Sequence, residues 1–137
     1  MGDNAGMTEQ TCATPSSMRP RIALYSHDTM GLGHIRRNTL IAQTLIQPPL
    51  SAQVLLVSGI RESGAFALPP GIDSITLPAY RKQPDGNYTA RALDMPLEQL
   101  VALRSQTILA ALTAFAPQLL IVDNVPRGAL SELDTVL

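Results

Sequence analysis

Both histidines of the chain, His27 and His34, lie within one short segment, IALYSHDTMGLGHIRRN. The segment is typical of a buried strand, then a glycine-containing loop, then the start of a helix. This order places imidazoles, exposed backbone N–H groups and the charges of Arg36 and Arg37 at the carboxyl end of a strand. Ligands bind at that position in open α/β sheets, so we expect a ligand site here.

The chemistry that this loop favours is general base catalysis. Gly31 and Gly33 allow the backbone to turn tightly and to approach a ligand with no Cβ in the way. His34 stands at the expected helix start, where the positive end of the helix dipole favours a neutral, proton-accepting imidazole. Such a group is suited to take a proton from a hydroxyl.

The arginine pair lies in the first turn of the expected helix, where positive charge is unfavourable. We expect an anion, either from a ligand or from the carboxylate of Asp28, to neutralise Arg36 and Arg37. A purely structural interpretation stays open: the glycines would form only a tight turn, His34 would cap the helix, and the arginines would form a solvated face.

The loop lacks the features of several other ligand sites. A P-loop requires Lys-Ser/Thr after its glycines, but this loop continues Gly33-His34-Ile35. A dinucleotide fingerprint requires a third glycine, where Arg36 stands, and an acid after the second strand, which ends Val57-Ser58-Gly59. Two histidines and a single cysteine, Cys12, have no metal-ligand spacing. We therefore expect no cofactor and no metal.

Segments of continuous apolar residues alternate along the chain with segments whose apolar residues have helical spacing. The apolar runs predict strands at Arg21–Ser26, Gln53–Ser58, Asp73–Leu77 and Gln118–Asp123. The periodicity predicts helices at Ile35–Ile46 and Met95–Phe115, and a short helix within Ile60–Phe66. This order predicts an α/β fold with a Rossmann-like, doubly wound parallel sheet. Right-handed crossovers would place the first and fourth strands side by side in its centre.

Other segments carry weaker predictions. Pro78–Arg91 is expected to be a long polar loop, and a further helix is expected to open at Asn124-Val125-Pro126. Arg104 interrupts the apolar stripe of the longest helix, and we expect its side chain to snorkel at the edge of that helix. His27 would contact a ligand or be satisfied by backbone at the strand end. The loops after the first and fourth strands would flank one crevice. Asp123 and Asn124 would point into that crevice, or one of them would cap the following helix.

Composition limits the function classes. The chain has 137 residues, 45% of them hydrophobic and 15% charged, as expected for one globular domain. Its formal net charge of −1 argues against binding to nucleic acid. Residues 1–20 are rich in small and polar residues and lack the apolar core of a secretory signal. We expect them to form a disordered tail on a cytoplasmic protein with no membrane span.

Three segments, in this order, resemble the amino-terminal half of GT-B glycosyltransferases: IALYSHDTMGLGHIRRN with its continuation IAQTL, then LPAYRKQPDGNY, then LLIVDNVPRG. More narrowly, they are similar to predicted glycosyltransferases related to family 28. That family includes the transferase that adds N-acetylglucosamine during peptidoglycan lipid synthesis. The resemblance covers nearly everything from Arg21 onward. The family-28 loop usually carries more glycines, whereas this one has Met30 and Leu32, so the acceptor stays open.

The resemblance implies two Rossmann-like domains that face each other across a cleft. Residues 21–137 would be the acceptor-side domain, truncated at its carboxyl end and inactive alone, and the missing domain would bind the nucleotide-sugar donor. A lipid acceptor would bring peripheral membrane contact. The histidine that ends the family's glycine loop matches His34, and its loop glycines match Gly31 and Gly33.

The working hypothesis is a hexosyltransferase that carries a sugar from a nucleotide-sugar to an unknown acceptor. His34 would be the catalytic base, and the substrate-binding residues would be Gly31, Gly33, His27, Arg36 and Asn124. Two alternatives remain open. One is a nucleotide-sugar epimerase of the same architecture, and the other is a non-catalytic Rossmann-like binding module.

Overall fold

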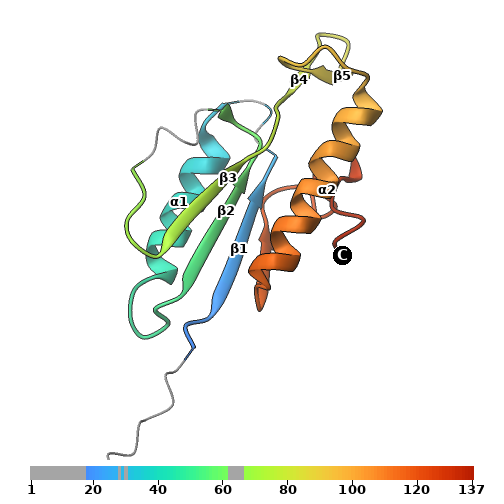
Figure 1. Ribbon diagram of the computed structural model, residues 1–137. Coiled ribbons are helices and arrows are strands. Elements are labelled where there is room, and N and C mark those ends of the chain that lie inside the picture. Colours follow the sequence, from blue (N-terminus) through green and yellow to red (C-terminus); the bar gives the residue numbers. More distant parts are fainter. Residues whose placement is uncertain (1–17, 28, 30, 62–66) are drawn as a thin grey trace, which may run out of the picture.

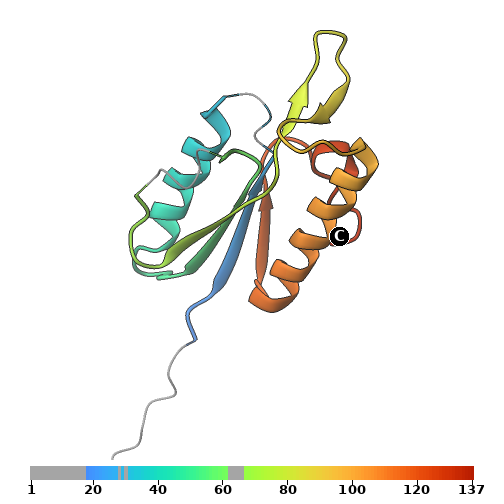
Figure 2. The same cartoon turned by 45° about the horizontal axis from the view of Figure 1, so that its top comes forward.

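The protein forms a four-stranded parallel sheet with one helix on each face (Figures 1 and 2). The computed structural model describes residues 18–27, 29, 31–61 and 67–137. The strand order is β3-β2-β1-β6. These strands are β1 (Arg21–Ser26), β2 (Gln53–Ser58), β3 (Ile72–Thr76) and β6 (Leu119–Val122). The predicted α/β class with a Rossmann-like parallel sheet is confirmed.

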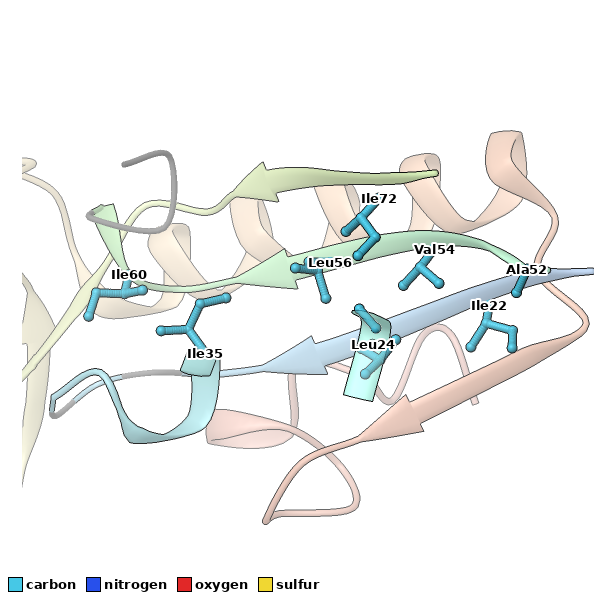
Figure 3. Close-up of a cluster of buried hydrophobic side chains, with 9 residues drawn as sticks. Ile22, Leu24, Ile35, Ala52, Val54, Leu56, Ile60 and Ile72 are labelled. Carbon is cyan, nitrogen blue, oxygen red and sulfur yellow. The ribbon is translucent and has the colours of Figure 1, made fainter. Parts of the chain in front are cut away.

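The two long helices cover opposite faces of the sheet. Alternate residues of each strand point to opposite faces, and the apolar side chains on both faces pack against a helix. Helix α1 (Gly33–Leu45) packs on the face that presents Ile22 and Leu24 (Figure 3). Helix α2 (Leu97–Phe115) packs on the other face, against Ala23 and Tyr25. A sheet buried on both sides requires strands that are apolar throughout, which explains the continuous apolar runs.

The core on the α1 side is built from aliphatic side chains of three neighbouring strands (Figure 3). Ile22, Val54 and Ile72 come from β1, β2 and β3, and Ile35 comes from the first turns of α1. The packing of Ile35 anchors the start of α1 against the carboxyl ends of the strands. The loop between β1 and α1 is therefore placed at that edge of the sheet.

Most of the predicted elements are confirmed, with small shifts at their ends. Strands β1 and β2 have the predicted bounds. Strand β1 pairs directly with β6, with Ala23 opposite Leu120 and Tyr25 opposite Val122. The prediction that both strands lie in the centre is wrong for β6. Among the described residues it forms an edge of the four-stranded sheet, with β1 as its neighbour.

The predicted long polar loop is instead a β-hairpin. Strand β4 (Tyr80–Lys82) pairs antiparallel with β5 (Tyr88–Ala90). In the tight turn between them, the backbone N–H of Asn87 donates to Asp85 Oδ1 at 3.0 Å. The hairpin extends beyond the sheet near the start of α2 (Figures 1 and 2). Strands of three residues are too short for the alternation that would identify them in a sequence.

The predicted helix after Pro126 is also wrong. The chain forms turns and the short 3₁₀ helix η2 (Ala129–Ser131) instead. Gly128 permits this turn, because its φ of +73° is left-handed and an added Cβ would lie 2.9 Å from Leu133. Leu130 and Ser131 have positive φ values as well, which no α-helix accommodates.

Arg104 does not snorkel at the edge of α2, as the sequence predicted. Its side chain is fully buried and paired with Glu132, which is also fully buried. The Glu132 carboxylate accepts hydrogen bonds from the hydroxyls of Tyr25 and Tyr80, from Arg104 Nε at 2.6 Å and from Arg104 Nη2 at 2.7 Å. We call these four residues the Glu132 cluster. Arg104 Nη1 donates to the Pro78 carbonyl at 2.5 Å.

Several predictions fall wholly or largely outside the described residues. These are the tail over residues 1–20, the short helix within Ile60–Phe66, and the pairing of Asp28 with the arginines. Within the described ranges, no helix combines the length and the apolar character needed to cross a membrane.

Candidate functional site

Three charged or titratable side chains meet at the carboxyl end of the sheet, between the first turn of α1 and the end of β6. They are His34, Arg37 and Asp123, which we call the Asp123 cluster. The pairing of β1 with β6 brings them together, because Asp123 follows β6 directly and the loop after β1 leads into α1. The backbone N–H of Asp123 donates to the Tyr25 carbonyl at 2.9 Å, which fixes its position beside β1.

The carboxylate of Asp123 joins the other two side chains. His34 Nδ1 lies 2.9 Å from Asp123 Oδ2. Arg37 Nη2 donates to Asp123 Oδ1 at 2.6 Å and to Oδ2 at 2.8 Å, and Arg37 Nε donates to Oδ2 at 3.3 Å. Their side chains are 27% exposed for His34, 56% for Arg37 and 12% for Asp123. The carboxylate is therefore mostly covered, while the imidazole remains open to solvent.

These contacts constrain the tautomer of His34. An ionised carboxylate only accepts hydrogen bonds, so the 2.9 Å contact is a hydrogen bond when Nδ1 carries the proton. In the neutral imidazole, Nε2 then carries the lone pair that can accept a proton. Arg37 Nη2 also lies 3.0 Å from Nδ1 and could donate to it only in the opposite tautomer. Arg37 already donates to both oxygens of Asp123, so we assign the proton to Nδ1.

The electrostatics keep Asp123 ionised. Partial burial by itself would raise its pKa, but hydrogen bonds from Arg37 and His34 and their charges hold the pKa below the usual range. The carboxylate also supplies negative charge near the amino end of α1, whose first turn contains no acidic residue. An anion does neutralise Arg37, as the sequence predicted, but Asp123 provides it.

The predicted loop glycines differ in what the structure requires of them. Gly31 has a φ of +78°, a conformation that favours glycine. Gly33 is the first residue of α1, and an added Cβ there would meet no described atom within 4 Å. The interpretation of His34 as a helix cap is wrong, because α1 begins without any side-chain cap hydrogen bond.

The other predicted contact residues lie around the cluster. The ring of His27 lies beside that of His34, with centroids 5.4 Å apart and an interplanar angle of 44°. Arg36 is exposed in the first turn of α1. Asn124 is exposed with a φ of +80°, a conformation that asparagine tolerates better than most residues, and it caps no helix.

One pocket that the described residues form at this edge of the sheet does not include His34. It lies on the β3 side, at the base of the hairpin, whereas the Asp123 cluster lies on the β1–β6 side. Among the described residues, His34 is thus partly exposed but is not part of the lining of that pocket. Among the residues that the structure describes, no group of three or more His, Cys, Asp or Glu residues is arranged to hold a metal ion.

Sequence reasoning identified the members of the Asp123 cluster but not their connection. It placed Asp123 at a strand end and expected the loops after the first and fourth strands to flank one crevice. The signal that could have joined them was the lone acid at the end of the fourth strand, opposite a helix start with two arginines and no acid. Comparisons of the chain with protein-family models, curated proteins and solved structures found no match.

Proposed function

We propose that this domain is the acceptor side of a GT-B-type glycosyltransferase and that His34 is its general base. The observation that carries the proposal is the contact of His34 Nδ1 with Asp123 at the carboxyl end of a doubly wound sheet. In such sheets the crevice outside the strand ends, where the strand order reverses, receives the ligand. Here the order reverses between β1 and β6, which lie on either side of the Asp123 cluster.

The proposed reaction gives each member of the cluster one task. His34 Nε2 accepts the proton of an acceptor hydroxyl while that oxygen bonds to the anomeric carbon of a nucleotide-sugar. The bond from that carbon to the diphosphate breaks, and a nucleoside diphosphate leaves with the bonding electrons. Asp123 holds Nδ1 and stabilises the imidazolium that forms, and Arg37 keeps Asp123 ionised and oriented.

Open space around the loop supports an approaching substrate. A Cβ added at Gly31 or Gly33 would meet no described atom within 4 Å, so an acceptor can approach the backbone there. Arg36 is exposed in the same helical turn as His34 and is not among the ion pairs formed by the described residues, so it can meet an anionic or hydroxyl group of the substrate. A separate donor-binding domain would supply the nucleotide-sugar.

The test measures sugar transfer from labelled nucleotide-sugars by this chain together with its donor-binding domain. We expect His34→Ala to lower the turnover about 100-fold or more, since general base catalysis contributes roughly that much. Arg127→Gln is the matched control, because it removes an exposed cation from the loop after β6 and should leave transfer unchanged. A loss of only a few fold in His34→Ala would exclude His34 as the base.

A non-catalytic role is the second candidate, and one observation favours it. The Asp123 cluster is a network of ion pairs that joins α1 to the end of β6. Holding these two elements together is a role that requires no reaction. The labelled-sugar experiment separates the candidates. Label in a second molecule supports the transferase, and a changed sugar without a second molecule supports the epimerase. Unchanged nucleotide-sugar supports the binding module.

A further inference from the structure

The described residues enclose a pocket of about 560 Å³ at the base of the β4–β5 hairpin. It lies between the carboxyl end of β3, the hairpin and the start of α2. The residues that matter for its chemistry are three arginines and an apolar wall: Arg61, Arg81, Arg91, Leu77, Pro78 and Leu100. None of the site residues named above lines this pocket.

The pocket concentrates positive charge. Arg61 follows β2, Arg81 lies on β4 and Arg91 follows β5, so three separate segments each contribute an arginine to the lining of one pocket. The described lining residues include no aspartate or glutamate. Arg81 Nη2 donates to the Arg91 carbonyl at 3.2 Å, which joins the two arms of the hairpin and positions the Arg81 side chain.

Three arginines outside the pocket show how this chain satisfies a guanidinium internally. Arg37, Arg104 and Arg127 each pair with a carboxylate, namely Asp123, Glu132 and Asp134. Among the described residues, no such carboxylate pairs with the three arginines of the pocket. Arginines of one pocket that form no ion pair with a described residue are suited to an external anion, and the planar guanidinium matches the oxygens of phosphate and carboxylate groups.

The charge favours a phosphate over a carboxylate. One guanidinium satisfies a carboxylate, which carries one charge and two oxygens. A phosphate monoester carries close to two negative charges and three terminal oxygens, so it can use several guanidinium groups at once. Leu77, Pro78 and Leu100 then leave an apolar wall for the group esterified to it.

We propose that this pocket binds an organic phosphate, with its phosphate group between Arg61, Arg81 and Arg91 and its apolar ester group against the wall. All strands of the sheet are parallel, so the pocket and His34 lie at the same carboxyl edge. A molecule bound there would be the acceptor. That identification rests on the proposed function, whereas the binding itself does not.

The test uses calorimetric titration of the chain with hexyl phosphate, hexanoate and inorganic phosphate. We expect hexyl phosphate to bind saturably and more tightly than the other two. Arg81→Gln and Arg91→Gln should each weaken that binding about tenfold or more, since a hydrogen bond to a charged group contributes at least this much. Lys82→Gln is the matched control, because Lys82 lies on the same hairpin outside the lining.

A folding defect in the arginine variants would not leave the proposal untested. Amide shifts of the wild-type chain on titration with hexyl phosphate should be largest near Leu77, Ala79 and Ala92. Shifts confined elsewhere, equal affinity for hexanoate, or equal losses in Arg81→Gln and Lys82→Gln would overturn the proposal.

Co-sedimentation with vesicles containing phosphatidic acid identifies the source of the phosphate. Sedimentation that Arg81→Gln loses and Lys82→Gln keeps indicates a lipid phosphate, and its absence in the wild type indicates a soluble ester. Because these measurements need no donor, they fail independently of the proposed function. Phosphate binding without sugar transfer would support the proposed pocket and reject the proposed transferase. Sugar transfer without phosphate binding would reject only the proposed pocket.

Discussion

The molecule contains two polar clusters, each built around a carboxylate, and they differ in their access to solvent. The Glu132 cluster is fully buried, and its carboxylate accepts four hydrogen bonds from Tyr25, Tyr80 and Arg104. The Asp123 cluster lies at the carboxyl edge of the sheet, and its imidazole is 27% exposed. Both join elements that are far apart in the sequence.

The difference separates a structural task from the chemical task that we propose. A carboxylate with about four lone-pair sites is saturated by four hydrogen bonds, so the Glu132 cluster has nothing to offer a ligand. It connects β1, β4, α2 and the segment after η2. In the Asp123 cluster, the arginine and the imidazole both contact the carboxylate, which leaves Nε2 of His34 for an external group. This contrast supports placing the chemistry at Asp123.

The largest predicted effect is on the stability of the buried cluster. Glu132→Gln should lower the free energy of unfolding by about 3–5 kcal/mol, because removing one partner leaves the charge of Arg104 buried without compensation. Urea denaturation followed by circular dichroism measures this loss. Arg127→Gln is the control, since it breaks an exposed ion pair and should cost far less. Equal losses in the two variants would contradict the comparison.

The next prediction concerns alkaline pH. Burial first, and then the charge of Glu132, raise the pKa of Tyr25 and of Tyr80 well above the usual range. The unfolded chain releases these protons near pH 10, whereas the folded chain keeps them. Stability is therefore retained below about pH 10 and falls as the pH rises further.

The measurement uses Tyr88→Phe, which removes the remaining tyrosine hydroxyl of the three in the chain. In this variant, tyrosinate absorbance should appear only together with the loss of circular dichroism. Absorbance that grows while the fold is intact would show that the Glu132 cluster is open to solvent.

The smallest predicted effect is on the acid side and belongs to the open cluster. The pKa of Asp123 is lowered in the folded state, so its contribution to stability is complete above the usual aspartate range and is lost as the pH falls through the lowered value. Asp123→Asn should therefore reduce stability slightly at pH 7 and hardly at all near pH 2. Urea midpoints of both proteins between these pH values check this, and a constant difference would contradict it.

The sequence was sufficient for the sheet and the two long helices because these depend on local apolar patterns. Strand β1 and its neighbour β2 have the predicted bounds. The handedness of crossovers also placed β6 beside β1, which is the contact that forms the Asp123 cluster. That adjacency is the one long-range prediction that bears on the site.

The sequence was insufficient where a residue's environment depends on a distant partner. Periodicity placed Arg104 at the edge of an apolar stripe, but its partner Glu132 comes from a segment that has no regular helix to predict it. Similarly, Asp123 was expected at the site, but its pairing with His34 and Arg37 depends on side-chain geometry. The hairpin was missed because Tyr80–Lys82 and Tyr88–Ala90 are too short to alternate visibly.

The most direct test of the central claim is the tautomer of His34, observed in long-range ¹H–¹⁵N spectra of the imidazole at alkaline pH. We predict a protonated Nδ1 and a bare Nε2 in the wild type, and loss of this preference in Asp123→Asn. His27→Gln provides the assignment, because it leaves His34 as the only histidine. A protonated Nε2 in the wild type would mean that Arg37 donates to Nδ1. His34 would then have no free lone pair to accept the proton of the acceptor substrate's hydroxyl.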